Sequence, residues 1–508
     1  MAYVRTVKTA SGARAVQIVH SSRRGSRDIE HIGSAHDDAA LEALKAVARQ
    51  RLAAGQPELD FGLDFAALQA GSGTGGGPLA ITSSRMGHLW DALGHAFEVL
   101  GFEAATGGDE VFRALVLARI IEPTSKLDSL RVIEEAGVDP PSYATLKRRL
   151  PAFAKESWRQ ALATACAAHA RLGPASLVLY DVSTLYFEID TGDGFREPGF
   201  SKERRLEPQI TVGLLTDASG FPLMVNAFEG NQAETATMLP TIRSFMDAHQ
   251  LADVTIVADA GMISEANKRA IEAAGLSFIL GARIPDVPYV VAAWRQEHPD
   301  QEIPDGHIFT QPWPAGPADK RRDQTIYYQY RHDRARRTLR GIDEQVAKAE
   351  KAVAGKVAVK RNRFIKLTGA TKSVNRQLEA KARSLAGLKG YATNLDTAAE
   401  FVIDAYHRLF QIEKSFRMSK HDLQARPIYH HKRASIDAHL TIVFAALAIS
   451  RWIEQTTGWS IKKFVRTTRR YRTIQLQAGA HTLTAADPLP DDLRNALATI
   501  YGRVEGAH

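Results

Sequence analysis

The sequence predicts an α/β protein whose central domain is a mixed β-sheet covered by helices. Its hydrophobic patterns follow the order β-β-β-α-β-α-β, at residues 176–182, 209–217, 221–228, 234–249, 254–259, 264–274 and 276–280. The second and third strands are separated by Asp-Ala-Ser-Gly, which is a hairpin-type turn. Hairpin strands followed by strand–helix–strand units are typical of a mixed sheet with helices packed on it.

The chain has 508 residues, which is too long for one hydrophobic core, so we expect three or four domains. We divide it into a β-rich segment with one helix (1–70), a glycine-rich linker (71–85), a helical region (86–172), a first part of the sheet domain (173–288), a basic insertion (289–395), a second part formed by one long helix at 397–420 (396–425) and a C-terminal helical region (426–508). Hydrophobic residues make up 44% and charged residues 24% of the chain, which is ordinary for a soluble globular protein.

The N-terminal segment predicts a small β-sheet. Apolar and polar residues alternate at 3–8, 15–20 and 29–32, and a helix pattern follows at 37–52. Seven of the eight residues at 71–78 are glycine, serine or threonine, which is typical of a flexible linker or a loop tip.

The helical region consists of short helices in succession. Pro123 ends a helix at 109–121, Ser125 can cap the next helix, and Ser142 opens a third. This third helix carries three consecutive basic residues, Lys147, Arg148 and Arg149. A basic helix at the end of such a series suits a helix-turn-helix-like contact with DNA. A helical bundle with a solvated basic face would show the same pattern.

Charge adds a second indication of a polyanionic partner. The formal net charge is +8 and the pI is about 9.4, a balance that many proteins without such a partner share. Residues 320–389 contain 20 lysines and arginines against 6 aspartates and glutamates. Because this excess has one sign, it favours a phosphate-binding surface over a solvated helical arm with alternating charges.

Cysteine content and hydropathy indicate the compartment. The single cysteine, Cys166, can form neither an internal disulfide nor a thiolate zinc site, and we expect it to be buried. Residues 1–10 contain no apolar signal-peptide core, and the longest apolar run, 440–450, is too short to span a bilayer. We therefore expect a cytoplasmic protein that does not enter a membrane.

Two aspartates follow buried strand patterns. Asp181 ends the run Leu-Val-Leu-Tyr, and Asp259 ends the run Val-Thr-Ile-Val-Ala. An ionised carboxylate beside a hydrophobic strand is costly unless it is paired, caps a backbone group or binds a cation. Either aspartate alone could simply mark the exit from a strand, but two on neighbouring strands favour metal binding.

Glu413 is the third acidic candidate. Tyr406, Leu409, Glu413, Phe416 and Lys420 are spaced by three and four residues, so we expect them on one face of a helix. A glutamate on that face either binds a metal or forms an ion pair with Lys414 or Lys420.

Three carboxylates suit one kind of chemistry in particular. Cleavage of a phosphodiester needs an activated hydroxyl opposite a leaving oxyanion, and two Mg²⁺ ions about 3.5–4 Å apart can stabilise both oxygens. Mg²⁺ prefers carboxylate and water oxygens to imidazole or thiolate.

In these segments the sequence resembles the DDE transposases of bacterial insertion sequences, in particular the large IS-four-type group. The matching segments are 180–188, 199–202, 209–215, 220–222, 230–231 and 259–262. Tyr406, Glu413 and Lys420 match the group's Tyr-Arg-Glu-Lys signature. Leu409 stands at the usual arginine position, so Arg408 or Arg417 would have to make its contact with DNA.

The resemblance implies an RNase H-like core with a long insertion before the glutamate helix, and Asp181, Asp259 and Glu413 as its catalytic triad. It also implies Mg²⁺ or Mn²⁺ as cofactor, terminal inverted repeats and target DNA as double-stranded partners, and a homodimer in the synaptic complex. Tyr406 and Lys420 would contact DNA near the cut. Trp313 is either a packed aromatic of the insertion or a platform on which a flipped base stacks.

Other functions remain open. A DNA-binding protein that has lost cleavage would keep the basic surfaces, and a metal-dependent nuclease on the same fold would cut without joining strands. A hydrolase of small molecules fits worst, because the sequence has no clustered histidine ligands; His430 and His431 are adjacent and would diverge on a helix.

Overall fold

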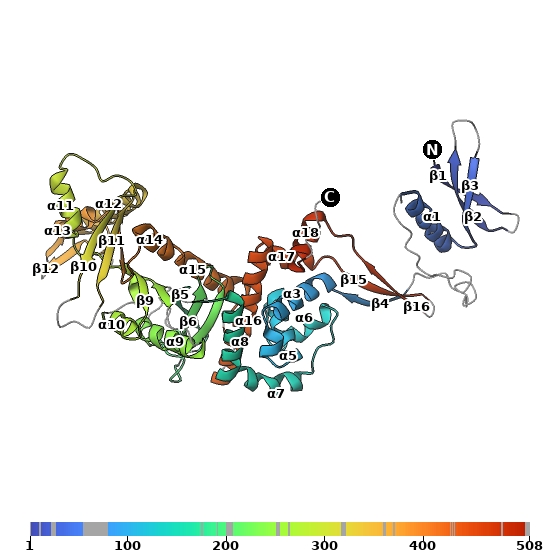
Figure 1. Ribbon diagram of the computed structural model, residues 1–508, viewed down its shortest axis with the longest axis horizontal. Coiled ribbons are helices and arrows are strands. Elements are labelled where there is room, and N and C mark those ends of the chain that lie inside the picture. Colours follow the sequence, from blue (N-terminus) through green and yellow to red (C-terminus); the bar gives the residue numbers. More distant parts are fainter. Residues whose placement is uncertain are drawn as a thin grey trace. The chain divides into compact units, whose positions relative to one another are not determined.

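The computed structural model describes the chain in two compact units, residues 1–87 with 471–488, and residues 88–470 with 489–508. The described residues are all except 1, 10–11, 22–26, 54–79, 174–175, 190, 200–206, 250–253, 263–264, 316–321, 359–361, 369–370, 427, 429, 431, 479–480 and 503–508. The glycine-rich run at 71–78 therefore lies outside the described residues. Figure 1 shows the elements of each unit.

The first unit contains the small sheet that the N-terminal sequence predicts. Strands β1 (Ala2–Lys8), β2 (Arg14–Ser21) and β3 (Arg27–Ala35) pair antiparallel, and helix α1 (Asp38–Ala53) packs on one face. Val16, Ile18, Leu41 and Ala48 form the buried core between the sheet and α1. These residues come from alternate strand positions and from one helix face, as expected for elements with a single buried side.

A second sheet in this unit corrects the predicted boundaries at both ends of the chain. Strands β4 (Ala80–Arg85), β15 (Thr473–Ala478) and β16 (His481–Ala486) pair in the order β16-β15-β4. We expected a linker at 71–85 and a helical region at 426–508. The alternation of Ile474 and Leu476 with glutamines has the period of a strand, and backbone pairing with β15 makes 80–85 a strand as well.

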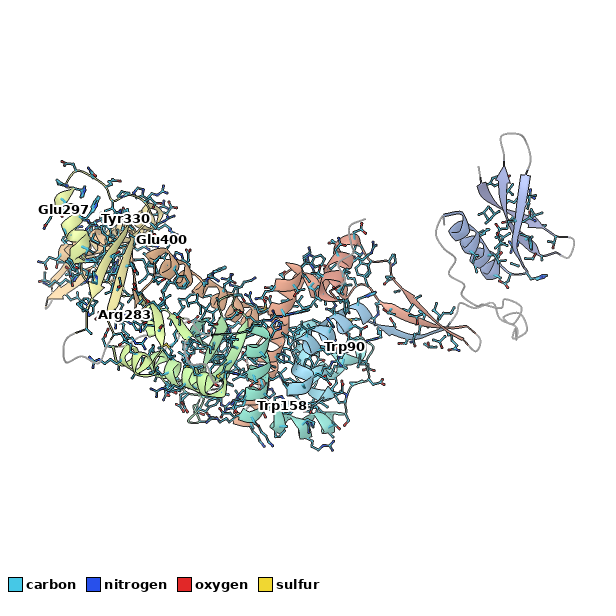
Figure 2. The ribbon with its side chains drawn as sticks, in the orientation of Figure 1. Trp90, Trp158, Arg283, Glu297, Tyr330 and Glu400 are labelled. Atoms are coloured by element: carbon cyan, nitrogen blue, oxygen red, sulfur yellow. The ribbon has the colours of Figure 1, made fainter. Side chains whose placement is uncertain are left out.

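The second unit begins with the predicted helices. They are α3 (Gly87–Val99), α4 (Phe102–Ala105), α5 (Glu110–Ile121), α6 (Ser129–Glu135), α7 (Tyr143–Phe153) and α8 (Glu156–Ala170). Rings of Phe112, Phe153 and Trp158, the last labelled in Figure 2, pack with centroids 5.0–5.5 Å apart and join α5, α7 and α8. Cys166 on α8 is fully buried, as predicted, and burial raises the pKa of its thiol.

The predicted β-β-β-α-β-α-β order is confirmed. It consists of β5 (Ser176–Tyr186), β6 (Gln209–Asp217), β7 (Pro222–Glu229), α9 (Glu234–His249), β8 (Val254–Ala258), a 3₁₀ turn (Ala260–Met262), α10 (Glu265–Ala273) and β9 (Ser277–Ala282). Strands β5, β8 and β9 run parallel, and the hairpin β6–β7 adds antiparallel strands beside β5. The sheet is therefore mixed, with its β8 strand buried throughout.

The segment predicted as an insertion extends this sheet. It contains α11 (Tyr289–Glu297), β10 (Ile308–Trp313), β11 (Gln324–Tyr330), α12 (His332–Val353), β12 (Ile365–Thr368), β13 (Thr371–Val374), α13 (Arg376–Ser384) and β14 (Leu388–Thr393). Strand β14 pairs antiparallel with β9, which gives eight strands in the order β10-β11-β14-β9-β8-β5-β6-β7. Figure 1 shows β10 and β11 continuing the sheet at the end opposite β6 and β7, whereas α12, α13, β12 and β13 enclose a small core of their own.

The single long helix predicted at 397–420 is wrong. The structure has α14 (Ala399–His407), α15 (Leu409–Arg417) and a π-helical turn (Met418–Asp422) instead. At the break, the backbone N–H of Arg408 is shared between the carbonyls of Asp404 and Ala405, and the N–H of Gln411 donates to the Arg408 carbonyl at 2.8 Å. The second bond joins residues three apart, as in a 3₁₀ turn, so the regular α-helical hydrogen bonding is interrupted at Arg408.

The C-terminal helices complete the second unit. They are α16 (Arg433–Thr457), α17 (Ile461–Thr468) and α18 (Asp491–Ile500). By length and composition α16 could cross a membrane, but 94% of its apolar window is buried inside the protein, where it packs against α5, α7 and β7. It is therefore built as a core helix.

Candidate active site

Asp181 and Asp259 lie side by side because of the parallel pairing of β5 with β8. The last residues paired between these strands are Leu179 and Val257. Asp181 lies two positions later within β5, and Asp259 lies two positions later, just after the end of β8. Neighbouring parallel strands lie about 4.8 Å apart, so this register brings the two carboxylates to one edge of the sheet. Tyr180 points to the other face, where its hydroxyl hydrogen-bonds Thr237 of α9 at 2.9 Å, and Asp181 consequently faces α15.

Glu413 reaches the same place from α15, which packs on β5. Asp181, Asp259 and Glu413 line one cavity of about 290 Å³, and Asp259 and Glu413 are exposed to it. The remaining lining residues are Tyr180, Lys389, Tyr406, His407, Leu409, Phe410 and Ile412. The structure thus brings together three acids that are far apart in the sequence.

The ion-pair alternative for Glu413 is not observed. Lys414 pairs with Glu454 of α16 at 2.9 Å, and Lys420 lines a different cavity. Among the residues that the structure describes, no side chain lies within ion-pair distance of the Glu413 carboxylate. This carboxylate is therefore available to a ligand in the cavity.

Tyr406 is tied to Asp259. Its hydroxyl donates to Asp259 Oδ1 at 2.5 Å, and the same oxygen accepts the backbone N–H of Ala260 at 2.8 Å. Burial raises the pKa of Tyr406, and the hydrogen bond to Asp259 raises it further, so the phenol stays a donor. The structure shows Tyr406 as a buried side chain that orients an acid, and the DNA contact expected from the sequence stays a prediction.

Lys389 is a member of the cavity that the sequence did not single out. It lies at the start of β14, and its ammonium nitrogen sits 4.4 Å from the centre of the Tyr406 ring. Burial lowers the pKa of Lys389, and the charges of Asp259 and Glu413 oppose this shift. Only the pairing of β14 with β9 could have revealed its position, because nothing in the local sequence marks it.

The three carboxylates fit a hard divalent cation by their chemistry, since they offer only oxygen donors. Asp181 and Asp259 each have one oxygen held by a backbone N–H, Val182 and Ala260 respectively, both at 2.8 Å, which fixes their orientation. Within the described part of the chain, no three His, Cys, Asp or Glu side chains converge closely enough to hold one ion. A single ion held by all three acids would therefore require their carboxylates to move closer together.

The other residues predicted to bind DNA near the cut lie outside this cavity. Arg408 is exposed at the break between α14 and α15 and lines a neighbouring cavity of about 670 Å³. Arg417 is exposed at the end of α15. Lys420 lies in the π-helical turn and lines a small cavity with Phe416 and α16 residues. The turn widens the helix there, so the regular spacing no longer keeps Lys420 on the face of Glu413.

On α7, the three basic residues have different surroundings. Lys147 and Arg148 are exposed, and the Lys147 ammonium lies 4.5 Å from the centre of the Tyr143 ring. Arg149 instead pairs with Asp109, whose side chain is 5% exposed and caps α5 by accepting the N–H of Phe112. Lys147 and Arg148 therefore face solvent, whereas Arg149 joins two helices.

Trp313 is 47% exposed at the end of the edge strand β10. The packed alternative predicted for this residue is thus not what the structure shows. In the same segment, several basic residues of the 320–389 stretch are paired with its acids, for example Arg376 with Glu350 and Arg383 with Asp343. Because basic residues outnumber acids, an excess of positive charge remains on this surface.

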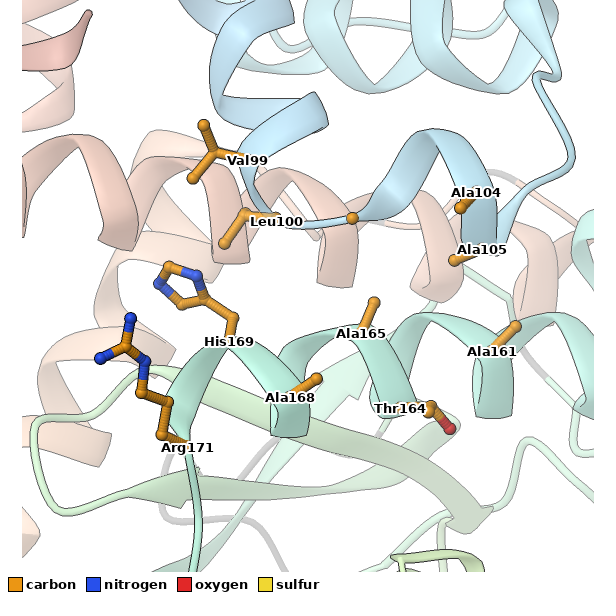
Figure 3. A pocket seen from close by; sticks show the side chains of 11 residues that line it. Val99, Leu100, Ala104, Ala105, Ala161, Thr164, Ala165, Ala168, His169 and Arg171 are labelled. Atoms are coloured by element: carbon orange, nitrogen blue, oxygen red, sulfur yellow. The ribbon is translucent and has the colours of Figure 1, made fainter. Parts of the chain in front are cut away.

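A larger cavity of about 790 Å³ lies between α8 and the segment joining α3 to α4 (Figure 3). Figure 3 shows that its walls are mostly small apolar side chains, with His169 and Arg171 at one end. It contains no carboxylate. The cavity with the three acids is therefore the better candidate for an active site.

Comparison with known proteins gives a family for the larger part of the chain. Residues 173–449 match the family described as "Transposase DDE domain". No curated protein matches the chain. Among solved structures, the chain is similar to one titled "Cryo-EM structure of piggyBac transposase synaptic complex with hairpin DNA", with a TM-score of 0.37 and 12% identity, covering 75% of this chain and 70% of that chain. The family match spans more than half of the chain and includes all three acids, so this protein belongs to the DDE-domain transposases, enzymes that cleave DNA and join its strands.

Proposed function

We propose that this transposase acts at the terminal inverted repeats of an insertion sequence, and that Asp181, Asp259 and Glu413 hold two Mg²⁺ or Mn²⁺ ions for both cleavage and strand transfer. The supporting observation is that a mid-sheet strand, the end of its parallel neighbour and a helix deliver the three acids to one cavity. When bound, the ions would polarise the scissile phosphate and stabilise the attacking and leaving oxygens.

The chain's own residues prepare this site. Backbone N–H groups hold one oxygen of each aspartate, and the Tyr406 hydroxyl fixes Asp259 from the side. Glu413 is carried by α15, which is anchored to the sheet through the buried residues Leu409, Ile412 and Ser415. Ser415 donates to the carbonyl of Gly220 at 2.7 Å, so the glutamate helix is tied to the β6–β7 turn. Such anchoring supports the positional precision that in-line attack requires.

The signature residues around Glu413 support assignment to the IS-four-type group, with an RNase H-like core formed by β5–β9. Double-stranded DNA would contact the exposed Lys147 and Arg148 and the basic surface of 320–389, because lysines and arginines on such surfaces neutralise phosphates. A synaptic homodimer would hold the two element ends together in the bacterial cytoplasm.

The decisive experiment uses DNA that carries the element's own ends. We expect the wild-type protein to nick such DNA and to join pre-cleaved ends to a target plasmid in Mg²⁺ or Mn²⁺. Replacing any one acid, as in Asp181→Asn, Asp259→Asn or Glu413→Gln, should reduce both reactions by about 10³-fold or more, because a lost metal ligand removes several kcal/mol of transition-state stabilisation.

Matched controls separate this proposal from its alternatives. Glu400→Gln changes an exposed glutamate near the start of α14 and should leave both reactions intact. End binding without metal-dependent cleavage by the wild type would indicate a DNA-binding protein, and cleavage without joined product would indicate a nuclease. Unchanged strand transfer by Asp259→Asn would contradict the triad.

A further inference from the structure

Lys389 is brought to the acidic cavity by the extension of the sheet. Strand β14 runs antiparallel to β9, which is itself parallel to β8 and β5. The start of β14 therefore lies near the carboxyl end of β8, which Asp259 follows, and near the middle of β5, which carries Asp181. Lys389 is the second residue of β14, and its side chain lines the cavity with the three acids.

The surroundings of its ammonium group are unusual for a lysine. The side chain is half-buried, and Nζ lies 4.4 Å from the centre of the Tyr406 ring and 5.9 Å from that of Tyr391. Asp259 and Glu413 act on it through longer-range attraction. Among the described residues, no hydrogen bond or ion pair within 4.0 Å engages this ammonium. Its three N–H groups can therefore donate hydrogen bonds to an acceptor that enters the cavity.

Nearby cations are used differently. Arg334 donates to the carbonyls of Gln329 and Gly387, which stabilises the start of β14. Lys414 is occupied by Glu454 on the far side of α15. Of the cavity's lining residues, Lys389 is the one lysine or arginine.

We propose that the Lys389 ammonium has two roles in the active site. It offsets the negative charge of Asp259 and Glu413 while no metal is bound, and it binds a non-bridging oxygen of the scissile phosphate when DNA enters. This inference rests on the proposed function of the three acids. Two divalent cations would more than neutralise three carboxylates, so metal and ammonium would then repel each other. A phosphodiester entering the cavity would attract the displaced ammonium, since a charge-assisted hydrogen bond to phosphate is a strong one.

The proposal gives Lys389→Met opposite effects on two binding equilibria. Without DNA, the variant should bind Mn²⁺ several-fold more tightly than the wild type, because the competing charge is gone. With Mn²⁺ present, its affinity for pre-cleaved element ends should fall by about tenfold, the value expected for one hydrogen bond to a charged group. Titration calorimetry of the full-length protein measures the first equilibrium, and fluorescence anisotropy of labelled ends measures the second.

Two further variants test the reason for these effects. Lys389→Arg keeps the charge and should retain most of the wild-type Mn²⁺ and DNA affinities. Lys155→Met removes an exposed lysine just before α8, outside both the cavity and the basic surface of 320–389, and should leave Mn²⁺ affinity unchanged. If Lys389→Arg behaved like Lys389→Met, the residue would act through packing, and the proposal would fail. Unchanged Mn²⁺ affinity and end affinity in Lys389→Met would overturn it equally.

Failure of the proposed triad would look different. In that case the Asp259→Asn and Glu413→Gln proteins would bind Mn²⁺ as the wild type does. If instead both lose Mn²⁺ binding while Lys389→Met changes neither equilibrium, the triad stands and only the role of Lys389 is refuted.

Discussion

A single glycine leaves room for the contact between Tyr406 and Asp259. Gly281 lies on β9 beneath this pair, and a Cβ atom built there would lie 2.8 Å from the Tyr406 hydroxyl and 3.0 Å from the backbone nitrogen of Ala260. Both atoms hydrogen-bond Asp259 Oδ1. Since contacts below 3.0 Å force something to move, any side chain at 281 would disturb the orientation of Asp259.

We predict that Gly281→Ala lowers strand transfer by about ten- to a hundredfold, because displacing a catalytic group by even 1 Å has a cost of that order. Gly341→Ala is the matched control. Position 341 lies within α12, and a Cβ there would meet no atom within 4 Å. It should leave activity unchanged and stabilise the protein slightly, since alanine is the better helix former. Strand-transfer rates and melting temperatures should be measured for both variants. A wild-type rate of strand transfer in Gly281→Ala would contradict the prediction, because it would show that the site works with Tyr406 displaced.

The acids and their neighbours differ in how far the sequence could predict them. Asp181 and Asp259 could be found because each ends an apolar run on a strand, and strands of that kind tend to pair in parallel. The hydrogen bond between Tyr406 and Asp259 could not be found, because it depends on the absence of a side chain at Gly281. Lys389 escaped prediction since its position depends on which strand β14 pairs with.

At the scale of elements, the order of the sheet could be predicted from the sequence, but the break in the glutamate helix could not. No glycine or proline lies at Arg408, so local propensity predicted continuation through the break. The π-helical turn at Met418–Asp422 is equally unmarked, and it moves Lys420 to another cavity. The strands β15 and β4 were missed for a related reason: each becomes a strand by pairing with a segment almost 400 residues away.

Helix α7 allows its basic residues to be separated by function. We predict that the double variant Lys147→Glu/Arg148→Glu weakens binding to element DNA and makes that binding less salt-dependent, because these exposed side chains are placed to neutralise phosphates. Its melting temperature should match that of the wild type. Electrophoretic mobility shifts over a range of salt concentrations measure the effect, and an unchanged salt dependence would assign this helix to the solvated surface of a bundle.

The neighbouring variant Arg149→Ala should lose stability and keep its DNA affinity. Removing the guanidinium leaves the buried Asp109 carboxylate with only its helix-capping bond, which we expect to reduce the free energy of unfolding by about 1–3 kcal/mol. DNA affinity measured on the folded protein should change little. Urea denaturation distinguishes this role from phosphate binding, since a DNA-contacting arginine could be removed without loss of stability.

At the scale of the whole molecule, the second unit is held together by contacts between distant segments. The sheet collects strands from both sides of α12, and α16 packs against helices and strands formed some 200 to 300 residues earlier. One such contact is polar: Lys126, before α6, and His439 of α16 hydrogen-bond at 2.9 Å in the protein interior. His439 also hydrogen-bonds the carbonyl of Ala425 at 3.2 Å, so this ring connects three segments.

This buried histidine makes stability depend on pH. Burial lowers the pKa of His439 well below its ordinary 6.5, and the nearby charge of Lys126 lowers it further. Above pH 6.5 the ring is neutral in both the folded and the unfolded chain, so it adds no pH dependence. Below pH 6.5 the imidazole of His439 binds a proton in the unfolded chain but stays neutral in the folded protein. The free energy of unfolding therefore falls by up to about 1.4 kcal/mol per pH unit, until the pKa of the folded state is reached.

We predict that His439→Asn removes this loss, because an amide can still accept a hydrogen bond from Lys126 but does not titrate. Urea denaturation at pH 7.5, 6.5 and 5.5 should show the wild type losing stability more steeply than the variant, and only in the lower interval. Other titrating groups, including Lys126, contribute to both proteins and cancel in the difference. If the free energies of unfolding of the two proteins changed equally with pH, His439 would be protonated in the folded protein as well. The contact between α16 and the segment before α6 would then open without unfolding the rest.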